Sequence, residues 1–543
     1  MELPYDVGRT FTEEVKVFIA LGGIALALLW PWRPSPRARR PWVAALVLLT
    51  LFSGWNYARW GPKALSVRID TYDVIHYYLN AKYFDELGYL DLYPAMLLAD
   101  ADNDGPFFEK QGNVYLAQSE ERGHYWDSVA NGIARGREVR EERFTPERWA
   151  AFEHDALYMQ RVRGCMERDK KDRCRAELSD KLWRQMIVDH GFNGTTVWTF
   201  LARPITQVVP VESVKLLGFL DVIVLGAAVG AVVWAYGSVP GLWITLFLLT
   251  TYSTRWPYLT WVFLRYDWVA GLLFAMAFLK KGRPFVAGLF AGYTAVLRIF
   301  PVVWMWGPFG KGVAGLIRGV VRRPLLVLAG GFLVAVIGLQ GAATLSLGSH
   351  QVRTHIENMV DHNDPQQLSS RRVGLALALS TPVTAGTERP TNISPEHKTL
   401  IEAQQPLRYA LAALLILALG WVVRRLRDDE AYAYGFLPFF WITTASYYYY
   451  VARITLALAH ASDFERSWRH RTGLVMLLAM EVLTNWASVN VGKHRMVLIG
   501  SLAWMLVAYG LVQLIWMEIE AREQDSRDPV RRAGESGTVG ESV

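Results

Sequence analysis

The sequence predicts an all-α polytopic membrane protein with about 11–13 transmembrane helices, short hairpins included, and a mainly helical extracytoplasmic insertion. Hydrophobic residues make up 52% of the 543 positions, and 22 residues are Trp. Apolar runs recur along the chain, and a helix of about 20 apolar residues spans a hydrocarbon core of about 30 Å. No alternating barrel pattern appears, and helices satisfy their own backbone groups in lipid. Helices are therefore the expected spanning form.

The apolar runs and the polar stretches between them divide the chain into six regions. These are two N-terminal transmembrane helices in 1–57, an outer domain in 58–214, a helical bundle in 215–347, an outer loop in 348–406, a second bundle in 407–517 and a polar tail in 518–543. The tail contains Gly and Ser and few apolar residues, so we expect it to be disordered.

Short basic loops orient these regions. They read RPSPRARR (33–40), KKGR (280–283), RGVVRR (318–323) and RRLR (424–427). Such loops stay on the cytoplasmic side, which places 58–214 and 348–406 on the opposite side. Much of the net charge of +7 lies in them, so no nucleic-acid partner is predicted. The Ala- and Arg-rich composition, without an endoplasmic-reticulum retrieval signal, favours a bacterial inner membrane with the outer regions in the periplasm.

Residues 285–308 have basic loops on both sides, and a single crossing would put one loop outside. The favoured alternative is a hairpin of two short helices that turns near Arg298 and Pro301, because Pro301 interrupts the helical hydrogen bonds. Arg298 must then face protein, water or a phosphate. A similar hairpin is predicted in 432–461, around SYYYYVAR, with RSWRHR (466–471) on the inside.

The outer domain contains two helical patterns and both cysteines. Residues 144–162 start with Thr-Pro-Glu, which suits an N-cap followed by Pro in the first turn, and 175–193 shows similar periodicity. Cys165 and Cys174 suit a disulfide in an oxidising compartment, with two free thiols as the alternative. Asn193 and Asn392 begin glycosylation sequons.

One acidic stretch of the outer domain, DADNDG (100–105), resembles the start of a calcium loop. Asp100, Asp102 and Asp104 would be the ligands of a divalent cation. Gln111 stands where such a loop has its final Glu, and an acidic turn is the alternative. No cofactor is otherwise predicted.

The stretch DTYDVIHYYLNAKYFDELGYLDLY (70–93) carries the strongest chemical signal. A helix here places Asp73 and Tyr77 on one face, with His76 beside them, and Asp70 is positioned to cap its start. An aromatic belt at the lipid headgroups explains the tyrosines but not the acids and the histidine together. A carboxylate there is suited to act as a general base toward a hydroxyl.

Three motifs resemble the GT-C class of membrane glycosyltransferases, in the branch that uses polyprenol-phosphate-mannose. That branch has a catalytic Asp early in its first outer loop, a short hairpin with Arg or Lys three residues before Pro, and a histidine-bearing outer loop ending in Gly-Leu. The corresponding residues here are Asp73, Tyr77, Ala81, Gly88 and Tyr93, then Arg298 and Pro301, then His355, His362 and Val373-Gly374-Leu375. The chain departs from the branch in its Arg265-Tyr266-Asp267, its extra N-terminal helix and its longer first loop.

The resemblance implies an inverting transfer of a sugar from a polyprenyl-phosphate donor to an outer hydroxyl on a glycan, lipid or protein. Asp73 would be the base, with Asp70 as its substitute or orienting partner. The donor phosphate would be bound by Arg298, then by Arg265, Arg371 and Arg372, and the substrates by His76, Tyr77, His355 and His362. Arg265 could instead pair with Asp267, and Arg371 and Arg372 with lipid headgroups. His190 and Asn193 are further candidates for reaching the site.

Two other functions remain open at this point. A transporter or flippase for a lipid-linked molecule also explains intramembrane arginines and interrupted helices. A non-catalytic assembly protein or receptor explains the outer domain as its binding part.

Overall fold

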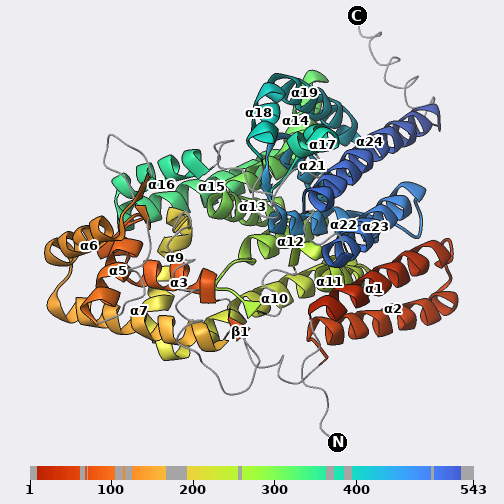
Figure 1. Cartoon of the computed structure of the whole chain (residues 1–543). Coiled ribbons are helices and arrows are strands. Elements are labelled where there is room, and N and C mark those ends of the chain that lie inside the picture. Colours follow the sequence, from red (N-terminus) through yellow and green to blue (C-terminus); the bar gives the residue numbers. More distant parts are fainter. Residues whose placement is uncertain are drawn as a thin grey trace, which may run out of the picture.

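The computed structural model describes residues 9–60, 68–69, 71–103, 114–116, 125–166, 192–254, 260–362, 372–384, 394–490 and 495–527 (Figure 1). The predicted helix 175–193 falls almost wholly outside these ranges, as do Cys174 and Asn392. The side chain of Cys165 is likewise not described, so the disulfide stays a prediction.

Helices dominate the described chain. The N-terminal pair and the outer domain comprise α1 (Arg9–Leu29), α2 (Pro36–Tyr57), β1 (Arg68–Ile69), α3 (Thr71–Lys82), α4 (Phe84–Leu87), α5 (Leu92–Asp102), β2 (Val114–Leu116), β3 (Tyr125–Asp127), α6 (Val129–Arg143), α7 (Pro146–Met166) and α9 (Thr196–Val208). The first bundle comprises η2 (Val211–Leu217), α10 (Gly218–Tyr236), α11 (Ser238–Thr250), η3 (Tyr252–Thr254), β4 (Thr260–Trp261), α12 (Asp267–Lys280), α13 (Pro284–Arg298), η4 (Phe300–Met305), α14 (Trp306–Ile317) and α15 (Arg323–Leu347).

The remaining elements form the second outer loop and the C-terminal bundle. They are α16 (Ser349–His362), β5 (Arg372–Val373), α17 (Leu375–Thr384), α18 (Pro395–Ala403), α19 (Gln405–Val422), η6 (Val423–Arg425), α20 (Asp428–Ala433), α21 (Phe436–Ile442), β6 (Ala445–Ser446), η7 (Tyr447–Arg453), α22 (Ile454–Ala461), α23 (Trp468–Asn490) and α24 (Arg495–Arg527). The strands among the described residues form three short pairs, β1 with β4, β2 with β3 and β5 with β6.

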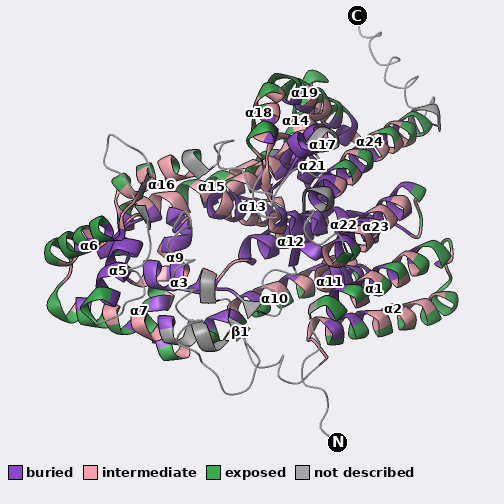
Figure 2. Ribbon diagram, viewed as in Figure 1, coloured by how far each residue is buried: buried purple, intermediate pink, exposed green. Residues whose placement is uncertain are grey.

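The chain is an all-α polytopic membrane protein, as predicted. Within the described ranges, five stretches are long and apolar enough to cross a membrane: 211–236, 323–347, 405–425, 468–490 and 499–523. Figure 2 shows the central helices α12 and α22 as mostly buried, whereas α15 and α19 are largely exposed. The exposed residues on α15 and α19 include large apolar side chains such as Ile337, Leu345, Leu417 and Trp421. Apolar surface of this kind is stable against lipid rather than water.

The segment 285–308 turns back on itself. Helix α13 ends at Arg298, and Ile299 follows with φ of 59°. The chain then returns through η4 and α14, where Lys311 pairs with Asp428. At the start of the hairpin, Lys280 precedes α13, and its Nζ atom lies 5.2 Å from the centre of the Tyr236 ring. The Tyr236 hydroxyl donates to Asp429 at 2.9 Å, so the start of α13 and the end of α14 lie on one side of the bundle, as a hairpin requires.

Residues 432–461 show the same kind of arrangement. Short helices α21 and α22 flank η7, which carries the SYYYYVAR tyrosines. Arg427, before the first of them, donates to Asp463, after the second, at 2.6 Å. The two ends of this segment therefore also meet on one side.

The outer domain packs α3 to α7 and α9 around an aromatic core. Helix α7 begins where Thr145-Pro146 predicted, and Thr145 Oγ1 accepts the N–H of Arg148 at 3.3 Å. The calcium loop is not formed by Asp100 and Asp102, because both belong to helix α5. Gln160 donates to Asp100 at 2.9 Å and Arg140 to Asp102 at 2.7 Å, while Asp104 lies outside the described residues.

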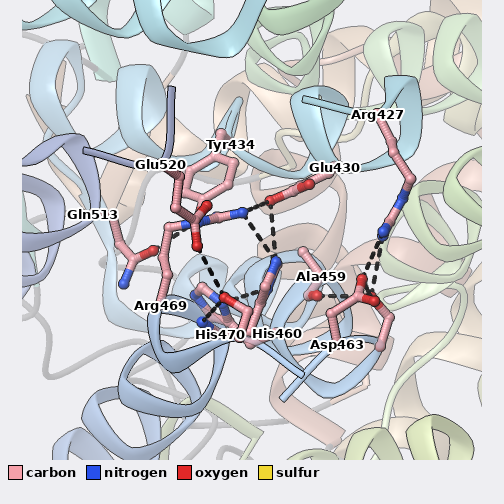
Figure 3. A network of polar contacts seen from close by, with 12 residues as sticks. Arg427, Glu430, Tyr434, Ala459, His460, Asp463, Arg469, His470, Gln513 and Glu520 are labelled. Carbon is pink, nitrogen blue, oxygen red and sulfur yellow. Dashed lines mark hydrogen bonds and ion pairs between the residues drawn. The ribbon is translucent and has the colours of Figure 1, made fainter. Parts of the chain in front are cut away.

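The predicted disordered tail starts ten residues too early, because 518–527 continue α24. A buried polar network stabilises this extension (Figure 3). Arg469 of α23 donates to Glu520 of α24 at 2.7 Å and to Glu430 of α20 at 2.6 Å. His460 of α22 adds a 2.6 Å hydrogen bond with Tyr509 of α24. Four elements of the C-terminal bundle are thus held by one network of ion pairs and hydrogen bonds.

Candidate functional site

The start of α3 lies beside the turn that carries Arg265. Strand β1 pairs in parallel with β4, with Ile69 opposite Trp261. Asp73 and Arg265 each follow four residues beyond this pair. Because paired parallel strands run side by side in one direction, the two residues leave the sheet together. Two distant segments of the sequence are thereby brought to one place.

Asp73 and Arg265 form an ion pair. This contact corrects the alternative in which Arg265 pairs with Asp267. The Asp267 carboxylate instead accepts the Trp268 N–H at 2.8 Å and the Tyr293 hydroxyl at 3.1 Å. The predicted base and one of the predicted phosphate ligands therefore contact each other directly.

The Arg265 turn is held by the buried Asp221 of α10. Its carboxylate accepts the N–H groups of Arg265 at 2.9 Å and of Tyr266 at 3.0 Å. The preceding Leu264 has φ of 48°, a conformation that is costly for a residue with a side chain and persists only where its surroundings impose it. The sequence reasoning missed Asp221, although an acid within an apolar run is by itself a signal of a special role.

Arg298 lies at the end of α13, on the wall of a cavity of about 490 Å³. The backbone strain at Ile299, a β-branched residue with positive φ, directs the chain away just after this arginine. Ile299 and Val302 also line the cavity and are almost half exposed. The cavity therefore joins a half-buried guanidinium to an apolar surface.

Arg372 reaches the same cavity from the second outer loop. It belongs to β5, which pairs with β6 so that Arg372 lies opposite Ser446. Its guanidinium donates to the carbonyl of Thr444 at 3.3 Å. Gly374 allows this close approach, since a Cβ atom there would lie 2.2 Å from the carbonyl oxygen of Thr443. The Val-Gly-Leu motif thus has a steric reason for its glycine.

Arg408 is a third cation on the cavity wall, and the sequence reasoning missed it. It lies in the first turn of α19, is buried, and its guanidinium carbon is 4.3 Å from the centre of the Tyr409 ring. Within the described part of the chain, the Nε atoms of Arg408 and Arg298 have no hydrogen-bond partner. An arginine at the outer edge of an apolar run was the available signal, but it reads as an ordinary helix flank.

Tyrosines connect the ion pair with the cavity. The Arg265 guanidinium carbon lies 4.5 Å from the centre of the Tyr448 ring, and the Tyr448 and Tyr449 rings are 4.4 Å apart. Tyr449 lines the cavity. On the other side, Tyr77 donates to Asn193 at 2.8 Å and contacts Arg298. Asn193 therefore lines the cavity, and Tyr77 lies next to it against Arg298.

The histidines lie elsewhere. His76 is buried and hydrogen-bonded to Tyr93 at 2.6 Å. His355 is buried with its ring centre 5.5 Å from that of Tyr89, and burial lowers its pKa to about 4. Neither lines the arginine cavity. The side chain of His362 is not described, and Asp70, His190 and Arg371 lie outside the described residues.

The site is strongly cationic. Arg298, Arg372 and Arg408 line one cavity, and Arg265 stands next to it with Asp73 as its counter-ion. Arginine presents a planar set of donors that matches phosphate oxygens. Among the described residues, no group of three or more His, Cys, Asp or Glu side chains is placed to hold a metal ion. The arrangement suits a ligand with an anionic head and an apolar body.

No protein-family model, curated protein sequence or solved structure matches this chain.

Proposed function

We propose that this protein is an inverting glycosyltransferase that moves a sugar from a polyprenyl-phosphate donor to an acceptor hydroxyl on the extracytoplasmic side of a bacterial inner membrane. The observation that supports this most is the Asp73–Arg265 ion pair beside a cavity with three further arginines. A carboxylate and a group of phosphate-binding cations are what such a transfer needs. The cavity's apolar mouth suits the polyprenyl chain.

In this reaction the acceptor oxygen attacks the anomeric carbon, and the bond from that carbon to the phosphate oxygen breaks. The electron pair of that bond leaves with the lipid phosphate, whose charge becomes more negative. Arg298, Arg372 and Arg408 stabilise this charge, which lowers the barrier because they are already in position. The acceptor proton passes to the Asp73 carboxylate.

The ion pair gives donor binding a role in creating the base. A carboxylate bonded to a guanidinium is a weaker proton acceptor than a free one. A donor phosphate that contacts Arg265 would compete with Asp73 for its N–H groups. Donor binding then frees the Asp73 carboxylate from Arg265 and leaves it facing the acceptor. Asp73 is therefore the stronger base when a donor is bound.

The test is sugar transfer from radiolabelled polyprenyl-phosphate donors by the protein purified into lipid nanodiscs. Replacement of Asp73 by Asn keeps the shape of the side chain and removes the base, so we expect at least a ~100-fold lower rate. Asp102→Asn is the matched control, because Asp102 also pairs with an arginine but lies in the outer domain away from the cavity. We expect the control to transfer at the wild-type rate.

Transfer by wild type and by the control, but not by Asp73→Asn, supports the class and the base together. Transfer by Asp73→Asn at the wild-type rate overturns the role of Asp73 and turns attention to Asp70. Absence of transfer by folded wild type across a broad donor panel overturns the proposal in favour of the transport or assembly alternatives.

A further inference from the structure

A second pocket, of about 310 Å³, lies between the outer domain and α16. Figure 1 shows α16 beside α5 and α6, far from the N-terminal helices. Its polar wall includes Asp85 and Asp91 near α4 and α5, Arg135 and Arg143 of α6, and His350 and Gln351 of α16. None of these residues lines the arginine cavity.

The turn between α4 and α5 forms one wall of this pocket. Asn80 donates to the carbonyl of Gly88 at 2.8 Å. Gly88 has φ of 54°, and a Cβ atom there would lie 3.0 Å from Gln351 Nε2. The glycine therefore provides the turn and the space for the Gln351 amide, which lies at 3.0 Å from His350 Nε2.

The charges of the pocket are balanced within the protein. Arg135 binds both oxygens of Asp91, at 3.0 and 3.1 Å, and Arg143 adds a bond of 2.9 Å. Asp85 pairs with Arg203. An anionic ligand would meet two carboxylates, whereas a neutral ligand meets no charge repulsion and can replace its lost hydration by hydrogen bonds to the pocket.

The pocket offers both donors and acceptors to such a ligand. Guanidinium groups donate only, carboxylates accept only, and the Gln351 amide and the Thr354 hydroxyl do both. Tyr89 adds an aromatic wall. A polyhydroxylated ring carries donors and acceptors around an apolar face, which matches this combination. The volume lies at the low end of the ~300–1,000 Å³ range of small-molecule pockets, so it suits one or two sugar rings.

We propose that this pocket binds the saccharide part of the acceptor, an inference that rests on the proposed glycosyl transfer. The pocket is connected to the transfer site through α3 and an aromatic cluster. Tyr89 stacks on Phe192 with ring centres 5.6 Å apart, and Phe192 lies 5.5 Å from Tyr77. Tyr77 in turn contacts Arg298. The pocket and the donor cavity thus border the same aromatic cluster from opposite ends.

The first test is binding, which needs no transfer. Neutral mono- and disaccharides are titrated into the wild-type protein in nanodiscs by calorimetry, beside inorganic phosphate. Gln351→Leu removes the amide at nearly constant size and is expected to weaken saccharide binding at least tenfold. Arg353→Gln is the matched control, since Arg353 is on the same helix and its side chain is 84% exposed. The control is expected to bind as wild type does.

The second test uses the transfer assay. Gln351→Leu is expected to raise KM for the acceptor at least tenfold while KM for the donor and kcat stay unchanged. Saccharide binding that Gln351→Leu weakens supports the pocket even if wild type transfers no sugar, in which case only the enzymatic proposal fails. Phosphate binding that Gln351→Leu weakens would show that the pocket takes anions, and it overturns the inference. No saccharide binding by wild type, or equal behaviour of Gln351→Leu and the control, overturns it as well.

Discussion

Removal of the Glu481 carboxylate is expected to destabilise the protein strongly. Glu481 of α23 pairs with Arg453 of η7 at 2.9 Å, and both side chains are fully buried. The same carboxylate accepts the backbone N–H of Tyr252 at 2.7 Å. Glu481→Ala leaves a buried guanidinium without its counter-ion, which costs about 3–5 kcal/mol, and an N–H without an acceptor, which costs about 1–3 kcal/mol. Because the two losses share one site, we expect a total of about 4–6 kcal/mol rather than their full sum.

The assay is unfolding in mixed micelles of increasing SDS content, followed by tryptophan fluorescence. Glu481→Gln keeps an acceptor for the Tyr252 N–H and removes only the charge. It therefore separates the cost of the unpaired guanidinium from the cost of the unpaired N–H. Arg453→Met combined with Glu481→Leu removes both charges and is expected to recover most of the loss, since apolar pairs often replace buried ion pairs without cost. A loss below about 1 kcal/mol for Glu481→Ala, or a double variant less stable than either single variant, would refute the reasoning.

Two further predictions concern the cavity and the outer loop. Arg408→Gln should raise KM for the donor by about 10–100-fold, since a hydrogen bond to a charged group contributes about 1.5–3 kcal/mol. The control is Arg318→Gln, which removes an exposed cation outside the cavity and should leave KM for the donor unchanged. Equal effects of the two substitutions would contradict the role of Arg408. His355 has a folded pKa of about 4 against about 6.5 when unfolded, so the unfolded chain binds more protons between these values. Its contribution to stability, on the order of 3 kcal/mol, is complete above pH 6.5 and is lost as the pH falls to 4. The free energy of unfolding, measured between these pH values, should therefore fall less steeply in His355→Phe than in wild type. An equally steep fall in both proteins would refute the assignment.

Local patterns predicted the helices well. The apolar runs gave the membrane-spanning class, Thr145-Pro146 gave the start of α7, and Pro301 marked the interruption after α13. Each of these signals acts within one or two helical turns, where propensity and capping determine the backbone. The end of α24 was missed because Glu520 is stabilised by Arg469 of another helix, a contact that composition does not contain.

The candidate site was predicted as residue types, but its assembly was not. Asp73 and Arg265 meet through a parallel pair of two-residue strands, too short to leave a periodic signal. Asp221 holds the Arg265 turn from a third segment. Arg408 is added by a fourth segment, whose arginine looks like an ordinary helix flank. Such contacts depend on tertiary packing, which a single sequence read along its length does not display.

The supports of the site are themselves buried charges, and this links its stability to the proposed chemistry. Arg453 bonds to the carbonyl of Tyr450 at 3.0 Å and anchors η7 to α23 through Glu481. The same η7 carries Tyr448, whose ring lies against Arg265. Since a misplacement of about 1 Å in a catalytic group can cost ~100-fold in rate, a rigid anchor behind η7 is what a phosphate-binding site needs. A substitution that weakens the Glu481–Arg453 ion pair should therefore lower the rate of sugar transfer under conditions in which the protein is still folded. The reason is that Arg265 loses its aromatic support while Asp73 remains in place.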